Sequence, residues 1–272
     1  MHATSRESLS VARARLEDLT SDVDTSGLRT LAGELSAVAG VLTRERVLLR
    51  HLADPASAEA TREALAAGIF EGKIGALAVS VLRAAVALRW STSGNLVGAV
   101  ETLGRQAVLI AAERDGTLDE AEDELFRFSR VLGTENRLRA LLSDVQTPAD
   151  RRLELLHSVL DGKVGRDTLD LLAQAVRVPR GRSLDVLAGQ LAELAAERRQ
   201  RTVAQVSAAA PLTAEQEDRL ARVLSEIYRR TISVQVDVDP NVLGGLVVRV
   251  GDEVIDGSVA NKLALAARGL PS

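Results

Sequence analysis

The sequence contains no cysteine and few aromatic residues. Without cysteine, disulfides, thiolate nucleophiles and cysteine-ligated zinc are all excluded. Aromatic residues make up 2% of the 272 residues, and Ala, Leu and Val supply most of the hydrophobic 46%. This composition favours closely packed helices over a β-sandwich or a pocket lined by aromatic rings. The length is sufficient for two or three compact domains.

The sequence also lacks an excess of basic residues and a long hydrophobic run. Its formal net charge is −4 at pH 7, which does not fit the basic footprint of a nucleic-acid-binding protein. The longest uncharged apolar stretch, Ile74 to Leu82, is far shorter than the ~20 residues that cross a bilayer. The N-terminus lacks the apolar core of a signal peptide. We therefore expect no nucleic-acid partner and no direct membrane insertion.

Residue constellations for catalysis are missing as well. The three histidines, His2, His51 and His157, are far apart and have no carboxylate partner at ligand spacing. Neither a phosphate-binding loop nor a dinucleotide fingerprint is present. We expect no catalytic residue, no metal site and no cofactor, so the chain is not expected to be an enzyme by itself.

What is present up to about residue 200 is a series of short helices. Apolar residues recur at i, i+3, i+4 and i+7, which is typical of one buried helical face. Two sets with this spacing are Leu138, Leu141, Leu142 and Val145, and Leu169, Leu172, Ala173 and Val176.

A repeat with a period of 90 residues runs through this helical part. Residues 71–75, Glu-Gly-Lys-Ile-Gly, recur at 161–165 as Asp-Gly-Lys-Val-Gly, and Val41-Leu42 recurs as Val131-Leu132. Chance similarity between Ala- and Leu-rich helices is the alternative explanation. Matching glycines within matching apolar spacing favour duplication of one helical domain.

The repeat sets the expected domain boundaries. Residues 1–102 form a first, extra helical bundle and residues 103–200 a second one. The segment from about Asn95 to Arg114 would close the first copy and open the second. The first copy keeps an uncharged face, which is either core or a second docking surface. Its members are Leu77, Val81, Ala85, Leu88, Trp90 and Val97.

Residues 201–272 change to a strand pattern and predict a small α/β domain. Two segments with alternating residues, Thr202–Ala209 and Ile232–Val238, enclose a helix that begins with the capping box Thr213 to Gln216. A strand–helix–strand crossover makes the two strands parallel. The expected buried stripe of that helix is Leu220, Val223, Leu224 and Ile227.

Two further strands, Leu246–Val250 and Glu253–Ile255, flank Gly251-Asp252 as a hairpin turn, and a last helix covers about 258–270. The expected fold class is therefore mainly α with a small α/β C-terminal domain. Two tandem helical bundles precede a four-stranded mixed sheet with two helices.

The end of the chain carries its most specific pattern. Residues 239–263 read Asp-Pro-Asn-Val-Leu-Gly-Gly-Leu-Val-Val-Arg-Val-Gly-Asp-Glu-Val-Ile-Asp-Gly-Ser-Val-Ala-Asn-Lys-Leu. This segment resembles the C-terminal signature of F-type ATP synthase delta subunits, called oligomycin-sensitivity-conferring protein in mitochondria. The signature residues are Gly244, Gly245, Gly251, Asp252, Asp256, Gly257 and Ser258. Their roles are structural: glycines for turns, and Asp256 or Ser258 as the cap of the last helix.

The resemblance covers about residues 103–272, and residues 1–102 are explained by the repeat. Such an enlarged chain is similar to the delta subunit of actinobacteria. The resemblance implies a non-catalytic connector of the peripheral stalk, or stator. This connector holds the catalytic head against torque during proton transport and ATP synthesis.

The resemblance also implies partners. The helical domain would bind the N-terminal helix of an alpha subunit in a groove between helices near 103–114 and 168–176. The candidate lining residues are Ala107, Ala111, Leu172 and Val176. The C-terminal domain would bind the end of stalk subunit b, and one copy would sit peripherally at the cytoplasmic face of the bacterial cell membrane. The alternative is a helical adaptor of an unrelated complex.

Overall fold

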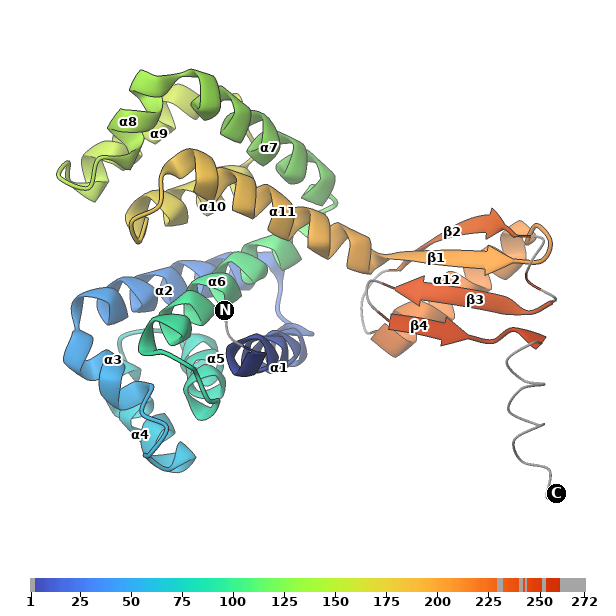
Figure 1. Cartoon of the computed structure of the whole chain (residues 1–272), viewed down its shortest axis with the longest axis horizontal. Helices are drawn as coiled ribbons and strands as arrows, with labels where there is room; N and C mark the ends of the chain where they lie inside the picture. Colours follow the sequence, from blue (N-terminus) through green and yellow to red (C-terminus); the bar gives the residue numbers. More distant parts are fainter. Residues whose placement is uncertain (1–2, 229–231, 240–241, 243, 251–252, 260–272) are drawn as a thin grey trace. The chain divides into compact units, whose positions relative to one another are not determined.

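The computed structural model describes residues 3–228, 232–239, 242, 244–250 and 253–259, and Figure 1 shows its elements. The chain divides into two compact units, Met1–Glu193 and Leu194–Ser272. The helices up to the division are α1 Ala3–Thr20, α2 Thr25–Arg44, α3 Arg46–Leu52, α4 Glu59–Phe70, α5 Ala76–Ala87, α6 Ser93–Asp115, α7 Leu118–Thr134, α8 Asn136–Ser143, α9 Ala149–Leu160, α10 Arg166–Arg177 and α11 Leu184–Thr202, which contains the division. The C-terminal unit contains β1 Val203–Ala208, α12 Ala214–Tyr228, β2 Ser233–Val238, β3 Leu246–Val250 and β4 Glu253–Asp256.

The predicted duplication is confirmed by the helix boundaries. Helices α3, α4 and α5 begin at Arg46, Glu59 and Ala76, and α8, α9 and α10 begin 90 residues later in each case. Helix α6 is one continuous helix that ends the first series and starts the second, as expected for the segment Asn95 to Arg114. The expected division after residue 102 lies inside this helix.

Side-chain hydrogen bonds repeat with the same offset. The Glu34 carboxylate accepts a hydrogen bond of 2.9 Å from the N–H of Gly75, which precedes α5. At the equivalent place, the Glu124 carboxylate accepts one of 2.9 Å from the N–H of Gly165, which precedes α10. The first N–H groups of a helix have no intrahelical partners. Each glutamate, which belongs to another helix, therefore stabilises the start of α5 or α10.

In each copy, a buried arginine of one helix donates hydrogen bonds to the last carbonyl groups of the next helix. The Arg62 Nε and Nη2 donate to the carbonyl oxygens of Val86 and Ala87, both at 2.7 Å. The Arg152 Nη1 donates to the carbonyl of Val176 at 2.9 Å. The last carbonyls of a helix lack intrahelical N–H partners and carry the negative end of its dipole, so a guanidinium satisfies both needs.

The turn before α4 and the turn before α9 also match. Hydrogen bonds from the N–H of Ala56 and the hydroxyl of Ser57 lower the pKa of Asp54. Those from Gln146 and Thr147 lower the pKa of Asp144 in the same way. The two copies therefore share a hydrogen-bonded framework as well as an order of helices.

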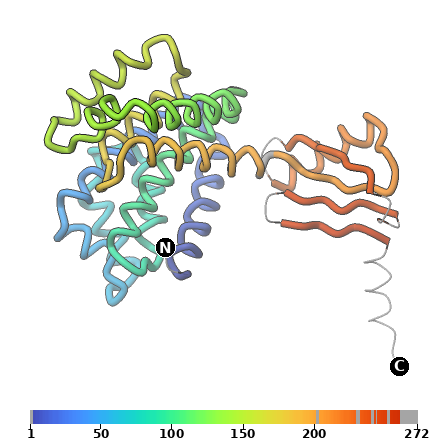
Figure 2. The backbone as a smooth tube through the Cα atoms, turned by 45° about the horizontal axis from the view of Figure 1, so that its top comes forward, coloured from blue at the N-terminus to red at the C-terminus, as the bar shows by residue number. Residues whose placement is uncertain are grey.

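The two copies pack against each other through α2, α6 and α10 (Figures 1 and 2). A Cβ atom added at Gly104 of α6 would lie 3.3 Å from the Ala32 carbonyl oxygen and from the Leu35 Cβ, both of α2, and 3.8 Å from the Gln174 Oε1 of α10. Glycine at this position allows the three helices to approach closely.

An ion-pair network closes the same contact. The Arg29 Nε of α2 donates to Asp167 of α10 at 2.7 Å, and its Nη2 donates to Asp115 of α6 at 2.6 Å. The hydrogen bonds to Asp167 and Asp115 raise the pKa of Arg29, against the effect of its burial. Arg29 in turn lowers the pKa of Asp115. One residue of the first copy thus joins both partner helices.

The predicted buried faces are correct in part. Leu172, Ala173 and Val176 are buried, as expected from their spacing. Leu141 is exposed although it lies within α8, and Val145 is exposed beyond the end of that helix at Ser143. In the first copy Val81, Ala85, Trp90 and Val97 are buried and Leu77 and Leu88 are half-buried, so most of the uncharged face lies in the core.

The C-terminal unit has the predicted mixed sheet, in the order β2-β1-β3-β4. Strands β1 and β2 are parallel, with Val206 opposite Val236, whereas β1–β3 and β3–β4 are antiparallel. Thr213 and Gln216 form the predicted reciprocal capping box at the start of α12. The core cluster is Ala204, Val206, Leu224, Ile232, Val248 and Val250. The turn residues Gly251 and Asp252 and nearly all of the last predicted helix lie outside the described residues.

Candidate functional site

The signature segment is a close backbone contact between the start of β3 and the residues after β4. Gly257 donates its N–H to the Leu246 carbonyl, and Val259 donates to the Gly244 carbonyl, both at 2.9 Å. Gly245 has φ of +81°, and a Cβ atom there would lie 2.5 Å from the Gly257 carbonyl oxygen. Only glycine permits both this backbone conformation and this approach.

Two polar signature residues complete the contact. The Asp256 Oδ1 accepts a hydrogen bond of 2.9 Å from the N–H of Ser258, and Ser258 itself is buried. Hydrogen bonds from the hydroxyl and N–H of Ser258 lower the pKa of Asp256. The hydrogen bond holds the chain's own backbone, and the capping role expected for these residues stays a prediction, since nearly all of the last helix lies outside the described residues.

The four residues expected to line a partner groove lie inside the helical unit. Ala107 and Ala111 of α6 and Leu172 of α10 are 0% exposed, and Val176 of α10 is 1% exposed. The contact of α2 with α6 and α10, through Gly104 and Arg29, contributes to this burial. Their side chains are therefore not accessible on the surface of the chain.

The equivalent helix pair of the first copy is more open. An offset of 90 residues relates α6 and α10 to α1 and α5, and a pocket of about 380 Å³ lies between α1 and α5. We call it the α1–α5 groove. It is lined by Arg15, Asp18, Leu19, Glu63, Ser80, Arg83 and Ala84. Leu19 is 39% exposed there, so the groove has apolar surface with charges around it.

The C-terminal unit has an apolar ridge on α12. Val223 and Ile227 are 44% and 61% exposed and stand one helical turn apart. The sequence pattern assigned both to the buried stripe, but only Leu224 of the four stripe residues is fully buried. The apolar spacing therefore marked these residues in the sequence. Only the position of the sheet shows that Val223 and Ile227 face outward.

Comparison with known proteins identifies the family. A family model described as ATP synthase delta (OSCP) subunit matches residues 105–270. The chain belongs to the ATP synthase delta (OSCP) subunit family. Members of this family are components of the peripheral stalk of F-type ATP synthase. The match begins inside α6, where the second series of helices starts, and it includes the signature segment.

Relatives extend over the whole chain. The "ATP synthase subunit delta" of Streptomyces avermitilis is 45% identical over 271 residues, covering 100% of this chain and 99% of the relative. The "ATP synthase subunit b-delta" of Mycobacterium sp. (strain KMS) is 48% identical over 271 residues, and this chain spans 61% of its length. Both matches include the first helical copy, which the family model leaves out.

A likeness to solved structures is weaker. A chain from the mitochondrial ATP synthase hexamer of Toxoplasma gondii is 18% identical, with a TM-score of 0.32 over 62% of this chain and 96% of that chain. A TM-score of this size is too low for a comparison of the two folds.

The part of the chain that the structure describes contains neither a membrane-spanning helix nor a metal-binding cluster. None of its helices has the length and apolar character needed to cross a membrane. In the same residues, no group of three or more His, Cys, Asp or Glu side chains is placed to hold a metal ion.

Proposed function

We propose that this chain is the non-catalytic connector between the catalytic head and stalk subunit b of an F-type ATP synthase. Torque generated during proton transport pulls on the head, and a connector bound at both ends resists that pull. The family match over residues 105–270 is the observation that carries the proposal. Two separate compact units, each with its own exposed apolar surface, suit a protein that holds two partners. Its place is peripheral, at the cytoplasmic face of the cell membrane, as one copy in the complex.

The head contact is proposed for the α1–α5 groove. In the family, the N-terminal helix of an alpha subunit binds between the first and fifth helices of the helical domain. In the second copy that pair is α6 and α10, and its candidate residues Ala107, Ala111, Leu172 and Val176 are buried. An apolar helix binds best where apolar surface is still available, which favours the equivalent pair of the first copy.

Replacing Leu19 by aspartate is expected to weaken binding of the alpha N-terminal helix at least tenfold. Burial of one Leu at an interface contributes about 1.5–3 kcal/mol, and about 1.4 kcal/mol corresponds to a factor of ten. The affinity would be measured by isothermal titration of the full chain with a peptide of that helix. Because Leu19 is partly exposed, the fold should persist.

Val47→Asp is the matched control, since Val47 is exposed on α3 of the same copy and does not line the groove. It should bind the peptide like the unchanged chain. Equal affinity of the Leu19→Asp variant would remove the α1–α5 groove and return the head contact to the α6–α10 pair, with α2 displaced.

The stalk contact is proposed for the ridge of Val223 and Ile227 on α12. A relative named subunit b-delta contains a region 48% identical to this chain and is longer than it, which supports a b segment as the partner. The amphipathic end of a b helix could bury this ridge, which the C-terminal unit leaves exposed.

The double variant Val223→Ser, Ile227→Ser is expected to bind subunit b at least tenfold more weakly, because two buried apolar contacts are lost. Pull-down with a soluble b fragment, followed by titration, measures the change. Arg222→Ser with Glu226→Ser is the control pair, since these exposed residues lie beside the ridge on the same helix. A loss that is equal in both pairs would show an effect on α12 itself and contradict the ridge contact.

The second candidate is a helical adaptor in an unrelated complex. The exposed Phe126 on α7 favours it slightly, since this side chain belongs to neither proposed contact. Isolation of the chain with bound partners from cells separates the two functions. Recovery of alpha and b subunits supports the connector, and recovery of other proteins without them supports the adaptor.

A further inference from the structure

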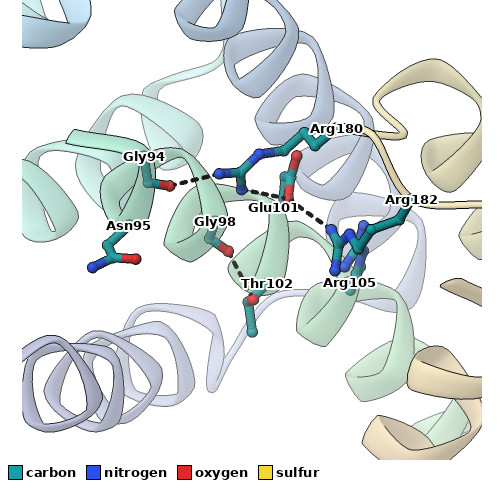
Figure 3. Close-up of a pocket in the computed structure, with 8 residues that line it drawn as sticks. All are labelled: Gly94, Asn95, Gly98, Glu101, Thr102, Arg105, Arg180 and Arg182. Carbon is teal, nitrogen blue, oxygen red and sulfur yellow. Dashed lines mark hydrogen bonds and ion pairs between the residues drawn. The ribbon is translucent and has the colours of Figure 1, made fainter. Parts of the chain in front are cut away.

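A pocket of about 310 Å³ lies between the N-terminal half of α6 and the loop that joins α10 to α11 (Figure 3). Three arginines, Arg105, Arg180 and Arg182, line it together with the single carboxylate of Glu101. Guanidinium groups remain charged at all physiological pH values, so the pocket has a net excess of positive charge. The other lining residues are Gly94, Asn95, Gly98 and Thr102.

Arg105 is the unusual member of the cluster. Its side chain is on α6 and the residue is only 8% exposed, yet its Nε has no hydrogen-bond partner in the described part of the chain. Burial, together with the charges of Arg182 and Arg180, lowers the pKa of Arg105, and only Glu101 acts in the opposite direction. A buried guanidinium N–H without a hydrogen-bond partner is costly, so the site is incomplete as the chain alone forms it.

Glu101 is also incompletely satisfied. Its Oε2 accepts a hydrogen bond of 3.2 Å from the Arg180 Nη1 and lies 3.9 Å from the Arg182 Nη2. Its Oε1 is buried and has no partner among the described residues. The pocket thus offers a free acceptor beside an arginine with an unused donor, one helical turn apart on α6.

Backbone geometry brings these groups together. Arg180 has φ of +49°, and its Nη2 donates to the Gly94 carbonyl at 2.9 Å. A Cβ atom at Gly98 would lie 3.1 Å from the Arg180 Nη1, so glycine lets the guanidinium lie against α6. Gly94 and Asn95 belong to the first turn of α6, where the helix dipole also favours an anion.

Only part of the cluster belongs to the duplicated framework, since Arg105 alone of the three arginines has an arginine, Arg15, as its equivalent in the first copy. At the 90-residue offset, the positions of Arg180 and Arg182 are occupied by Trp90 and Thr92. Trp90 is buried and donates its indole N–H to the Ala85 carbonyl, which is a packing role. The repeated fold is therefore built in the first copy without arginines at these positions.

We propose that this pocket binds an oxyanion of the phosphate class, with Arg105 as the main unsatisfied donor and Glu101 as an acceptor for a P–OH group. Guanidinium groups match the planar, paired oxygens of phosphate. Sulfate carries no hydroxyl at neutral pH and cannot donate to Glu101, whereas hydrogenphosphate can. The site therefore discriminates between the two ions.

The ion is either free phosphate or the phosphoryl group of a larger molecule. A second pocket of about 600 Å³ shares Gly94 and Arg180 with the first and adds Arg46 and Arg50. A diphosphate could therefore place its second group near these two arginines. Pyrophosphate and ADP are the probes that distinguish a free ion from a phosphoryl group.

The test is titration calorimetry of the full chain with inorganic phosphate at constant ionic strength, compared with sulfate. The expected result is 1:1 phosphate binding that is tighter than sulfate binding, and that weakens at least tenfold in Arg105→Met. Arg127→Met is the matched control, since Arg127 lies on the surface of α7 and pairs with Asp123. Absence of phosphate binding, or equal binding by Arg105→Met, overturns the proposal.

Unfolding of the same variants shows whether Arg105→Met is folded. Trp90 is the single tryptophan, so its fluorescence reports on the helical unit. Because Arg105 lacks a hydrogen-bond partner at Nε, Arg105→Met should unfold no earlier than the unchanged chain without phosphate, and it should gain no stability when phosphate is added. Should it fail to fold, Arg105→Lys replaces it: this variant keeps the charge, loses the planar fork, and is also expected to bind phosphate more weakly.

Glu101→Gln tests the acceptor separately. It should reduce the preference for phosphate over sulfate severalfold, since the amide can donate to either ion. A preference that does not change contradicts the role of Glu101. Tighter binding of pyrophosphate or ADP, in competition with phosphate and dependent on Arg105, identifies a phosphoryl group of a larger molecule as the ligand. This site is independent of the two partner contacts proposed above.

Discussion

The Gly245→Ala variant is expected to lose the fold of the C-terminal unit and, with it, binding of subunit b. The added Cβ atom would lie 2.5 Å from the Gly257 carbonyl oxygen, at a residue whose φ is +81°. The left-handed conformation costs a non-glycine residue about 1–2 kcal/mol, and the clash adds about 1–3 kcal/mol. A unit of this size holds only about 3–5 kcal/mol, so the change removes most of its stability.

Hydrogen exchange of the amides in β1 and β3 measures this loss. Gly257→Ala is the graded control, since its Cβ atom would lie 3.1 Å from the Leu246 carbonyl oxygen and its φ is not positive. It should weaken the same contact to a smaller extent. The helical unit should keep its unfolding midpoint and its binding of the alpha helix in both variants. If the amides of β1 and β3 in Gly245→Ala exchange as slowly as in the unchanged chain, the close contact between Gly245 and Gly257 is not required for the fold.

The second large effect is expected for Arg62→Met in the first helical copy. Arg62 is buried, and its guanidinium donates to four carbonyl oxygens: those of Val86, Ala87, Ser57 and Asp54. Its removal leaves buried acceptors at the end of α5 without partners, which costs about 1–3 kcal/mol for each group. Because the sites relax in part, we expect the free energy of unfolding to fall by about 3–5 kcal/mol.

Urea unfolding followed by Trp90 fluorescence measures this change directly, since Trp90 is bonded to the carbonyl of Ala85 near the end of the same helix. Arg152→Met should have the same sign and a smaller size, because within the described residues Arg152 donates to two carbonyls, those of Thr147 and Val176. Arg151→Met, at an exposed neighbour, is the control and should change little. A midpoint for Arg62→Met equal to that of Arg151→Met would contradict the capping role.

Local patterns were reliable where the chain's neighbours along the sequence determine the structure. The capping box at Thr213 and Gln216, the two parallel strands and the 90-residue repeat depend on residue spacing, and the structure agrees with each. The family was recognisable for a related reason. Its signature contains glycines because the backbone at these positions leaves no room for a side chain, as in the contact between Gly245 and Gly257.

Residue spacing failed where burial depends on a distant element. Val223 and Ile227 fit a buried stripe as well as Leu224 does, and only the position of the sheet leaves them outside. In the other predicted stripe, Val145 lies beyond the end of α8, which the apolar period does not mark, and Leu141 lies within α8 but is exposed.

The sequence by itself determined the helical and α/β parts, their repeat and the delta family, because periodicity and turn residues act over short distances. The tertiary structure decided which surfaces remain available. It buried Ala107 and Leu172 in the second copy and left the α1–α5 groove open in the first. It also assembled the pocket around Arg105 from residues as far apart as Gly94 and Arg182. No spacing rule reaches across such distances, since the packing of whole helices sets which side chains meet and which remain without a partner.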